Sequence, residues 1–157
     1  MLDRASTLVA LTAAAITASN SLSYAPDFAD MRGIWSGTYP VAYPASSNGG
    51  EPTVQNVEWI LKIDQQSENV FWGQSKWRIM GDVAWNVEEA TGSFSLADPN
   101  VVNMVEISPD PAIGGKGLME GKLSDGRLFV TFRGIPSGVS FSAVFERSDP
   151  DQETVMI

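Results

Sequence analysis

The sequence predicts an all-β fold, an eight-stranded antiparallel up-and-down barrel that follows an N-terminal signal or helix. After Asp30, apolar and polar residues alternate with a period of two in short segments, and no segment has a convincing helical period. Turn-forming residues separate these segments, so that consecutive strands are expected to pair. Closing such a sheet removes its unpaired edges. The alternative all-β arrangement is an open two-sheet sandwich.

The strands are bounded by Gly, Pro, Asn, Asp and Ser residues. The clearest alternation places Val57, Trp59 and Leu61 on one face of a strand. Ser124-Asp125-Gly126 predicts a tight hairpin, because Gly supplies a positive φ. The fourth strand is expected to be bulged. The predicted strands are 33–39, 57–64, 70–79, one within 83–96, 101–107, 117–123, 127–133 and 139–147.

Residues 1–25 resemble a secretory signal peptide. They carry no charge from Ala5 to Ala25, have an apolar stretch from about Leu8, and end in small residues before Pro26. We therefore expect a periplasmic or secreted protein that is cleaved after Ala25. The alternative is an N-terminal helix that packs on the barrel or tethers it. The remaining chain divides into a linker at 26–32, a barrel domain at 33–147 and a polar tail at 148–157.

Composition excludes several classes of function. The net charge is −9 and the ten Lys and Arg residues are scattered, whereas nucleic-acid binding needs a basic footprint. We expect no nucleic-acid partner and no membrane insertion of the barrel. The chain has no Cys and no His, which removes thiol nucleophiles, disulfides, His-based triads and imidazole metal sites. We expect no metal and no cofactor.

Two short motifs carry a family resemblance. Gly33-Ile34-Trp35 opens the first strand, and Phe145-Glu146-Arg147 ends the last. This pattern resembles the calycin group, which includes lipocalins, fatty-acid-binding proteins and avidins. The resemblance implies a structural floor in which Arg147 packs over Trp35 beside Gly33, an arrangement suited to a cation–π contact.

Length and short hairpins make the chain most similar to the avidin-like branch. Its biotin-binding residues are not carried over, because Gly37 stands where that family has an Asn. Gly33, Trp35, Gly37, Tyr39 and Pro40 are also similar to nitrobindin-like haem barrels. Those proteins bind haem through His, which this chain lacks.

Strand parity predicts a ligand site at one end of the barrel. The longest expected loop, 40–56, shares an end with the other long connections and is expected to act as a lid. Aromatic rings that line a concave apolar pocket are typical of small-molecule sites. Polar residues within apolar strand faces are expected to contact the ligand lower down. The predicted ligand-binding residues are Tyr39, Trp59, Trp77 and Trp85 near the mouth, and Ser75 and Asn103 below them.

No catalytic constellation is evident in the sequence. Glu88 and Glu89 are adjacent and therefore point to opposite faces of a strand. Glu106 and Glu120 are expected to face solvent. We therefore expect not an enzyme but a barrel that binds a small, largely apolar molecule. The alternative is a structural or assembly protein that forms a homo-oligomer through outward apolar residues. Those residues are Ile60, Trp72, Val102, Met104 and Val144.

Overall fold

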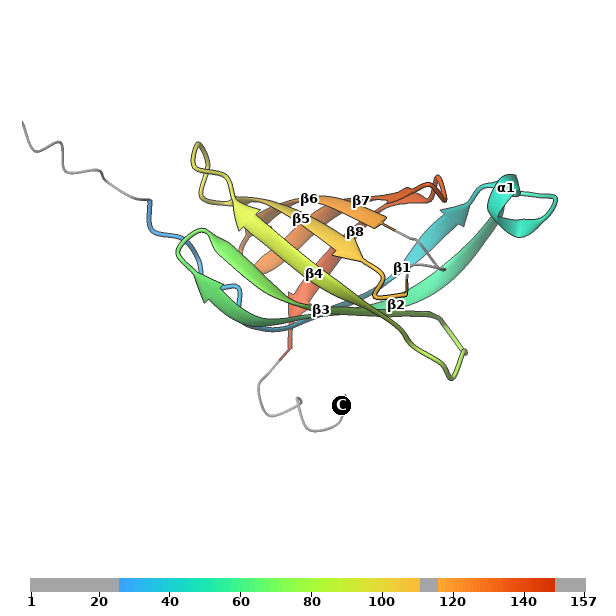
Figure 1. The fold of residues 1–157 in the computed structure, drawn as a ribbon, viewed down its shortest axis with the longest axis horizontal. Coiled ribbons are helices and arrows are strands. Elements are labelled where there is room, and N and C mark those ends of the chain that lie inside the picture. The colour runs from blue at the N-terminus through green and yellow to red at the C-terminus, as the bar shows by residue number, and fades with distance from the viewer. Residues whose placement is uncertain (1–25, 111–115, 149–157) are drawn as a thin grey trace, which may run out of the picture.

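The computed structural model describes residues 26–110 and 116–148, and these form a closed antiparallel β-barrel (Figure 1). Each strand pairs with the next, and β8 closes on β1. The predicted fold is confirmed, and the open sandwich is excluded. The elements are β1 (Gly33–Tyr43), α1 (Ala45–Asn48), β2 (Thr53–Ser67), β3 (Val70–Ile79), β4 (Asn86–Phe94), β5 (Val101–Ile107), β6 (Lys116–Ser124), β7 (Arg127–Ile135) and β8 (Ser140–Arg147).

The first hairpin is longer than the sequence predicted, and the expected loop over 40–56 is wrong. β1 continues to Tyr43 and β2 begins at Thr53, so the connection is 44–52 and contains α1. The hairpin projects beyond the rest of the barrel, with α1 at its tip (Figure 1). Much of the segment that was expected to act as a lid therefore belongs to the β1–β2 ladder.

Pro40 explains why this strand seemed to end early. Proline has no N–H for a ladder hydrogen bond and normally marks the edge or end of a strand. In the structure, the β1–β8 pairing is interrupted between Ser36 and Ala42, while the β1–β2 pairing continues past Pro40. The proline is tolerated because it lies where one ladder is already broken.

The bulge expected in the fourth strand lies in β2. β4 pairs with both neighbours without a shift in register. The β2–β3 register shifts between Ile63 and Gln65, so Asp64 is the extra residue. A bulge bends its strand and increases the local twist, which lets the fifteen-residue β2 curve around the barrel.

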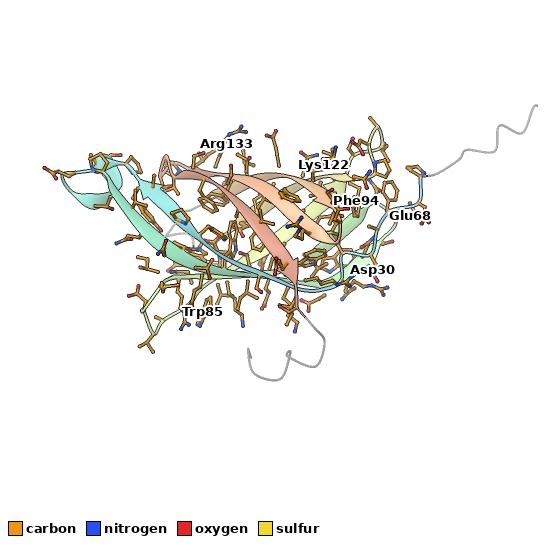
Figure 2. All side chains as sticks on the ribbon, turned by 180° about the vertical axis from the view of Figure 1, so that it is seen from behind. Asp30, Glu68, Trp85, Phe94, Lys122 and Arg133 are labelled. Atoms are coloured by element: carbon orange, nitrogen blue, oxygen red, sulfur yellow. The ribbon has the colours of Figure 1, made fainter. Side chains whose placement is uncertain are left out.

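The two ends of the barrel differ in their connections. We call the end that carries the β1–β2, β3–β4, β5–β6 and β7–β8 connections the mouth, and the opposite end the closed end. Residues 26–32 cover the closed end: Met31 is fully buried, and Phe28 stacks on Phe94 with ring centroids 5.3 Å apart. Phe94 is labelled at this end in Figure 2. The turns of the closed end are 68–69, 95–100 and 125–126.

The inward face of β5 is the opposite of the one that the sequence predicted. Val102, Met104 and Glu106 are buried, and Asn103 is exposed. The expectations that Asn103 points inward and that Val102, Met104 and Glu106 point outward are therefore wrong. Both faces of β5 carry apolar residues, so alternation alone could not choose between them. Packing against the neighbouring strand β6 accounts for the observed orientation. Val102 lies opposite Gly121, and a Cβ at Gly121 would lie 2.8 Å from Val102 Cγ2, so the glycine leaves room for the inward side chain.

Part of the expected domain division lies outside the described residues, namely the signal segment 1–25 and the tail from 149 onward. Within the described part, no helix is long and apolar enough to cross a membrane.

Candidate functional site

The mouth of the barrel opens into a cavity of about 350 Å³, which we call the cup. This volume lies within the range of small-molecule sites, about 300–1,000 Å³. The inward-facing residues near the mouth supply the wall of the cup, which is mainly apolar and aromatic. The apolar lining includes Val41, Val57, Trp77, Phe132, Val139 and Phe141.

Aromatic rings packed around Trp59 close the cup from below. Trp59 is buried, and four rings approach it edge to face. Edge-to-face packing is a favoured geometry for aromatic pairs, because the positive edge of one ring meets the negative face of the other. The distances between ring centroids are 5.1 Å to Phe145, 5.3 Å to Phe132, 5.4 Å to Phe141 and 5.9 Å to Tyr39.

A polar cluster interrupts the apolar lining on one side of the cup. The indole N–H of Trp59 donates to the hydroxyl of Ser75, and that of Trp77 donates to Glu88 Oε1 at 3.2 Å. The Glu106 carboxyl group lies beside the Ser75 hydroxyl and the Glu88 carboxyl group. The ladder positions these groups, because Glu88 on β4 lies directly opposite Ser75 on β3. Four consecutive strands, β2 to β5, therefore supply one polar cluster.

The electrostatics of this cluster are dominated by the burial of Glu106, which is only 1% exposed. Burial raises the pKa of Glu106 well above its usual range, and Glu88 raises it further, while the hydrogen bond from Ser75 opposes the shift. Glu106 therefore holds its proton more tightly than an exposed carboxyl group does. Lys116 also lines the cup, where it is exposed.

Two buried side-chain oxygens have no hydrogen-bond partner among the described residues: Glu106 Oε1 and the hydroxyl of Tyr39. Burial raises the pKa of Tyr39, and the charge of Glu106 adds to this, so its hydroxyl stays protonated. Buried polar groups are normally paired, and an unpaired one costs about 1–3 kcal/mol. Glu106 belongs to the lining of the cup, and its buried Oε1 is an acceptor without a hydrogen-bond partner among the described residues.

Gly117 on β6 makes room for this carboxyl group. It lies opposite Glu106 in the β5–β6 ladder. A Cβ at Gly117 would lie 2.3 Å from the ring of Phe132 and 3.1 Å from Glu106 Oε2. Any larger residue would therefore displace the carboxyl group, the ring, or both.

The predicted ligand-binding residues fall into three groups. Trp77 lines the wall of the cup, and Trp59 lines its base with Ser75 buried beside it. Tyr39 lies below, stacked on Phe141 with ring centroids 4.9 Å apart. The remaining two predicted residues, Trp85 and Asn103, lie away from the cup.

The expected position of Trp85 in the cup is wrong. β4 begins only at Asn86, so Trp85 belongs to the β3–β4 connection. The alternation of side chains along a strand therefore does not determine where Trp85 points. The Arg78 guanidinium lies 4.3 Å from the centroid of the Trp85 ring and also pairs with Glu58. Figure 2 shows Trp85 on the outside of the barrel. Asn103 faces outward with the exposed side of β5, as described above.

The residues of the structural floor meet at the closed end. Arg147 pairs with Trp35 in the β1–β8 ladder, and its guanidinium carbon lies 5.5 Å from the indole centroid. The Trp35 N–H donates to the carbonyl of Met31 at 2.8 Å, and Arg147 donates to the carbonyl of Arg32. Gly33 has φ +116°, and a Cβ there would lie 3.4 Å from Arg147 Nε. Gly33 thus leaves space for the guanidinium.

Sequence reasoning missed the carboxyl pair. It considered Glu88 beside Glu89 and Glu106 beside Glu120, whereas the barrel joins Glu88 to Glu106. The available signal was the spacing of Val102, Met104 and Glu106, which puts all three on one face of a strand. In the described part of the chain, no group of three or more Asp or Glu side chains could hold a metal ion.

Together these features define the class of molecule. The chain is an eight-stranded antiparallel β-barrel with an aromatic cup at its mouth, an architecture compatible with a calycin-like fold. No family model matches the chain, and neither curated proteins nor solved structures include a match.

Proposed function

We propose that this protein is an exported, calycin-like barrel that binds a small, largely apolar molecule in its cup. The observation that carries the proposal is the cavity of about 350 Å³ at the mouth, walled by apolar and aromatic side chains. Pockets of this kind bind ligands by burying apolar surface, while a few polar groups fix their orientation. Here those polar groups include Glu88 and Glu106.

The proposal favours binding over catalysis. The described cup offers a carboxyl pair but no Cys thiol and no His, and its lining is mostly apolar. Assembly through the outer wall has less support than the sequence suggested, because Val102 and Met104 are buried. Of the outward residues, Trp72 and Val144 are 39% and 41% exposed.

A dye titration tests the proposal. Prodan, a neutral naphthalene dye whose emission moves to the blue in apolar surroundings, should bind and show that shift. Trp77→Ala removes part of the cup wall and should weaken binding by about tenfold, the effect of losing about 1.4 kcal/mol of apolar contact. Trp85→Ala is the matched control, because it removes the same side chain from the outer surface. Equal effects of the two substitutions, or no binding at all, would contradict the proposal.

A further inference from the structure

Lys116 lines the same cup as the carboxyl pair, but it is exposed and does not form an ion pair with either carboxyl group. Neither Glu88 nor Glu106 forms an ion pair with any Lys or Arg in the described part of the chain. A buried carboxylate is costly unless it is paired, and burial raises the pKa of Glu106 well above its usual range. One oxygen, Glu106 Oε1, still lacks a hydrogen-bond partner among the described residues. The site therefore has unused capacity to accept hydrogen bonds and positive charge.

The neighbours of the pair restrict what could use that capacity. Phe132 and Phe141 stack with centroids 4.9 Å apart and form an aromatic wall of the cup with Trp77. A ligand that reaches Glu106 must place an apolar or aromatic body against these rings. Its polar end must donate hydrogen bonds, since carboxylate oxygens only accept them. A protein of net charge −9 also attracts cations.

We infer that the natural ligand of the cup is a small amine with an apolar or aromatic body, bound through its ammonium group between Glu88 and Glu106. The inference rests on the proposed binding function and specifies its ligand class. An ammonium group carries three donors and one positive charge, and it replaces the proton that Glu106 holds. That proton passes to the buffer, so the Glu106 carboxylate is ionised in the complex and charge is conserved. The aromatic wall contacts the body of the ligand.

The test compares phenethylamine with phenethyl alcohol, which has nearly the same shape but no charge. Isothermal titration calorimetry near neutral pH should give an amine affinity about tenfold or more above that of the alcohol, since hydrogen bonds to charged groups contribute about 1.5–3 kcal/mol. Titrations in buffers of different ionisation enthalpy should show protons released on binding of the amine and none on binding of the alcohol.

Variants then assign the effect to the pair. Glu106→Gln should remove most of the preference for the amine while changing the affinity for the alcohol little, and Glu88→Gln should act in the same direction. The second variant keeps the test decisive if the first does not fold. Glu89→Gln is the matched control, because Glu89 is the exposed neighbour of Glu88 on the same strand.

The outcomes separate the two proposals. If prodan binds but the amine has no advantage over the alcohol, whether both bind or neither does, the amine assignment is overturned and the binding cup stands. The amine assignment is likewise overturned if the preference for the amine survives both Gln substitutions. If neither prodan nor either phenethyl compound binds, the proposed function itself fails.

Discussion

Replacing Glu106 by Gln should make the protein more stable at neutral and alkaline pH. The substitution keeps the size of the side chain and a polar end beside Ser75 and Glu88, but removes the ionisable group. The folded-state pKa of Glu106 is raised above its ordinary value of 4.5 by burial and by Glu88. The folded protein therefore binds this proton more tightly than the unfolded chain does.

The sign of the pH dependence follows from that difference. The contribution of Glu106 to stability is fully present below about pH 4.5 and is lost as pH rises through the folded-state pKa. Within that window, the wild type should lose about 1.4 kcal/mol of unfolding free energy per pH unit relative to Glu106→Gln. The ionisable groups near Glu106 are Glu88 on β4, Tyr39 on β1 and Lys116, which lines the same cup.

Urea denaturation from about pH 5 to about pH 8 measures this difference. The free energies of the two proteins should lie close together at the acidic end and diverge as pH rises. Glu89→Gln provides the control: it makes the same chemical change at an exposed position, where we expect an effect within about 0.5 kcal/mol. Parallel curves for wild type and Glu106→Gln would show that Glu106 titrates alike in the folded and unfolded states, which would refute its burial beside Glu88.

Three further predictions concern the rest of the chain. Trp35→Ala should destabilise the barrel by about 3–5 kcal/mol and Arg147→Ala by about 0.5–2 kcal/mol in denaturant titrations. In a double-mutant cycle the two losses should not add, and simple additivity would mean that guanidinium and indole do not interact. Gly117→Ala should cost about 1–3 kcal/mol because its Cβ meets Phe132, whereas Gly50→Ala, whose Cβ meets nothing within 4 Å, should be nearly neutral. Mass spectrometry of protein from the native periplasmic or secreted fraction should show a chain without residues 1–25, and an intact Met1 would refute the cleavage.

Local chemistry was sufficient to predict most of the fold. Strands β3 and β5 have the predicted bounds of 70–79 and 101–107, because turn residues flank each of them directly. The hairpin at Ser124-Asp125-Gly126 likewise depends on a short-range requirement, the positive φ values at Asp125 and Gly126. Where Pro40 suggested an end to β1, the inference failed, because tolerance of a proline depends on the neighbouring strand.

The site was only partly predictable. Strong alternation fixed the inward face of β2 and so placed Trp59 correctly, and the apolar face of β3 did the same for Trp77 and Ser75. Trp85 was misplaced because its orientation depends on where β4 begins and on the cation–π contact with Arg78. That contact joins residues on two sides of a turn.

The sequence by itself determined that this chain alternates through eight strands and carries enough aromatic side chains to line a barrel, because those properties are local and periodic. Only the tertiary structure decided what lies in the cup. The two faces of β5 are similarly apolar, so its orientation depended on how its side chains fit against Gly117 and Gly121 of β6. That fit turned Glu106 inward toward Glu88, since register between strands is set by packing across the barrel and not by the residues of one strand.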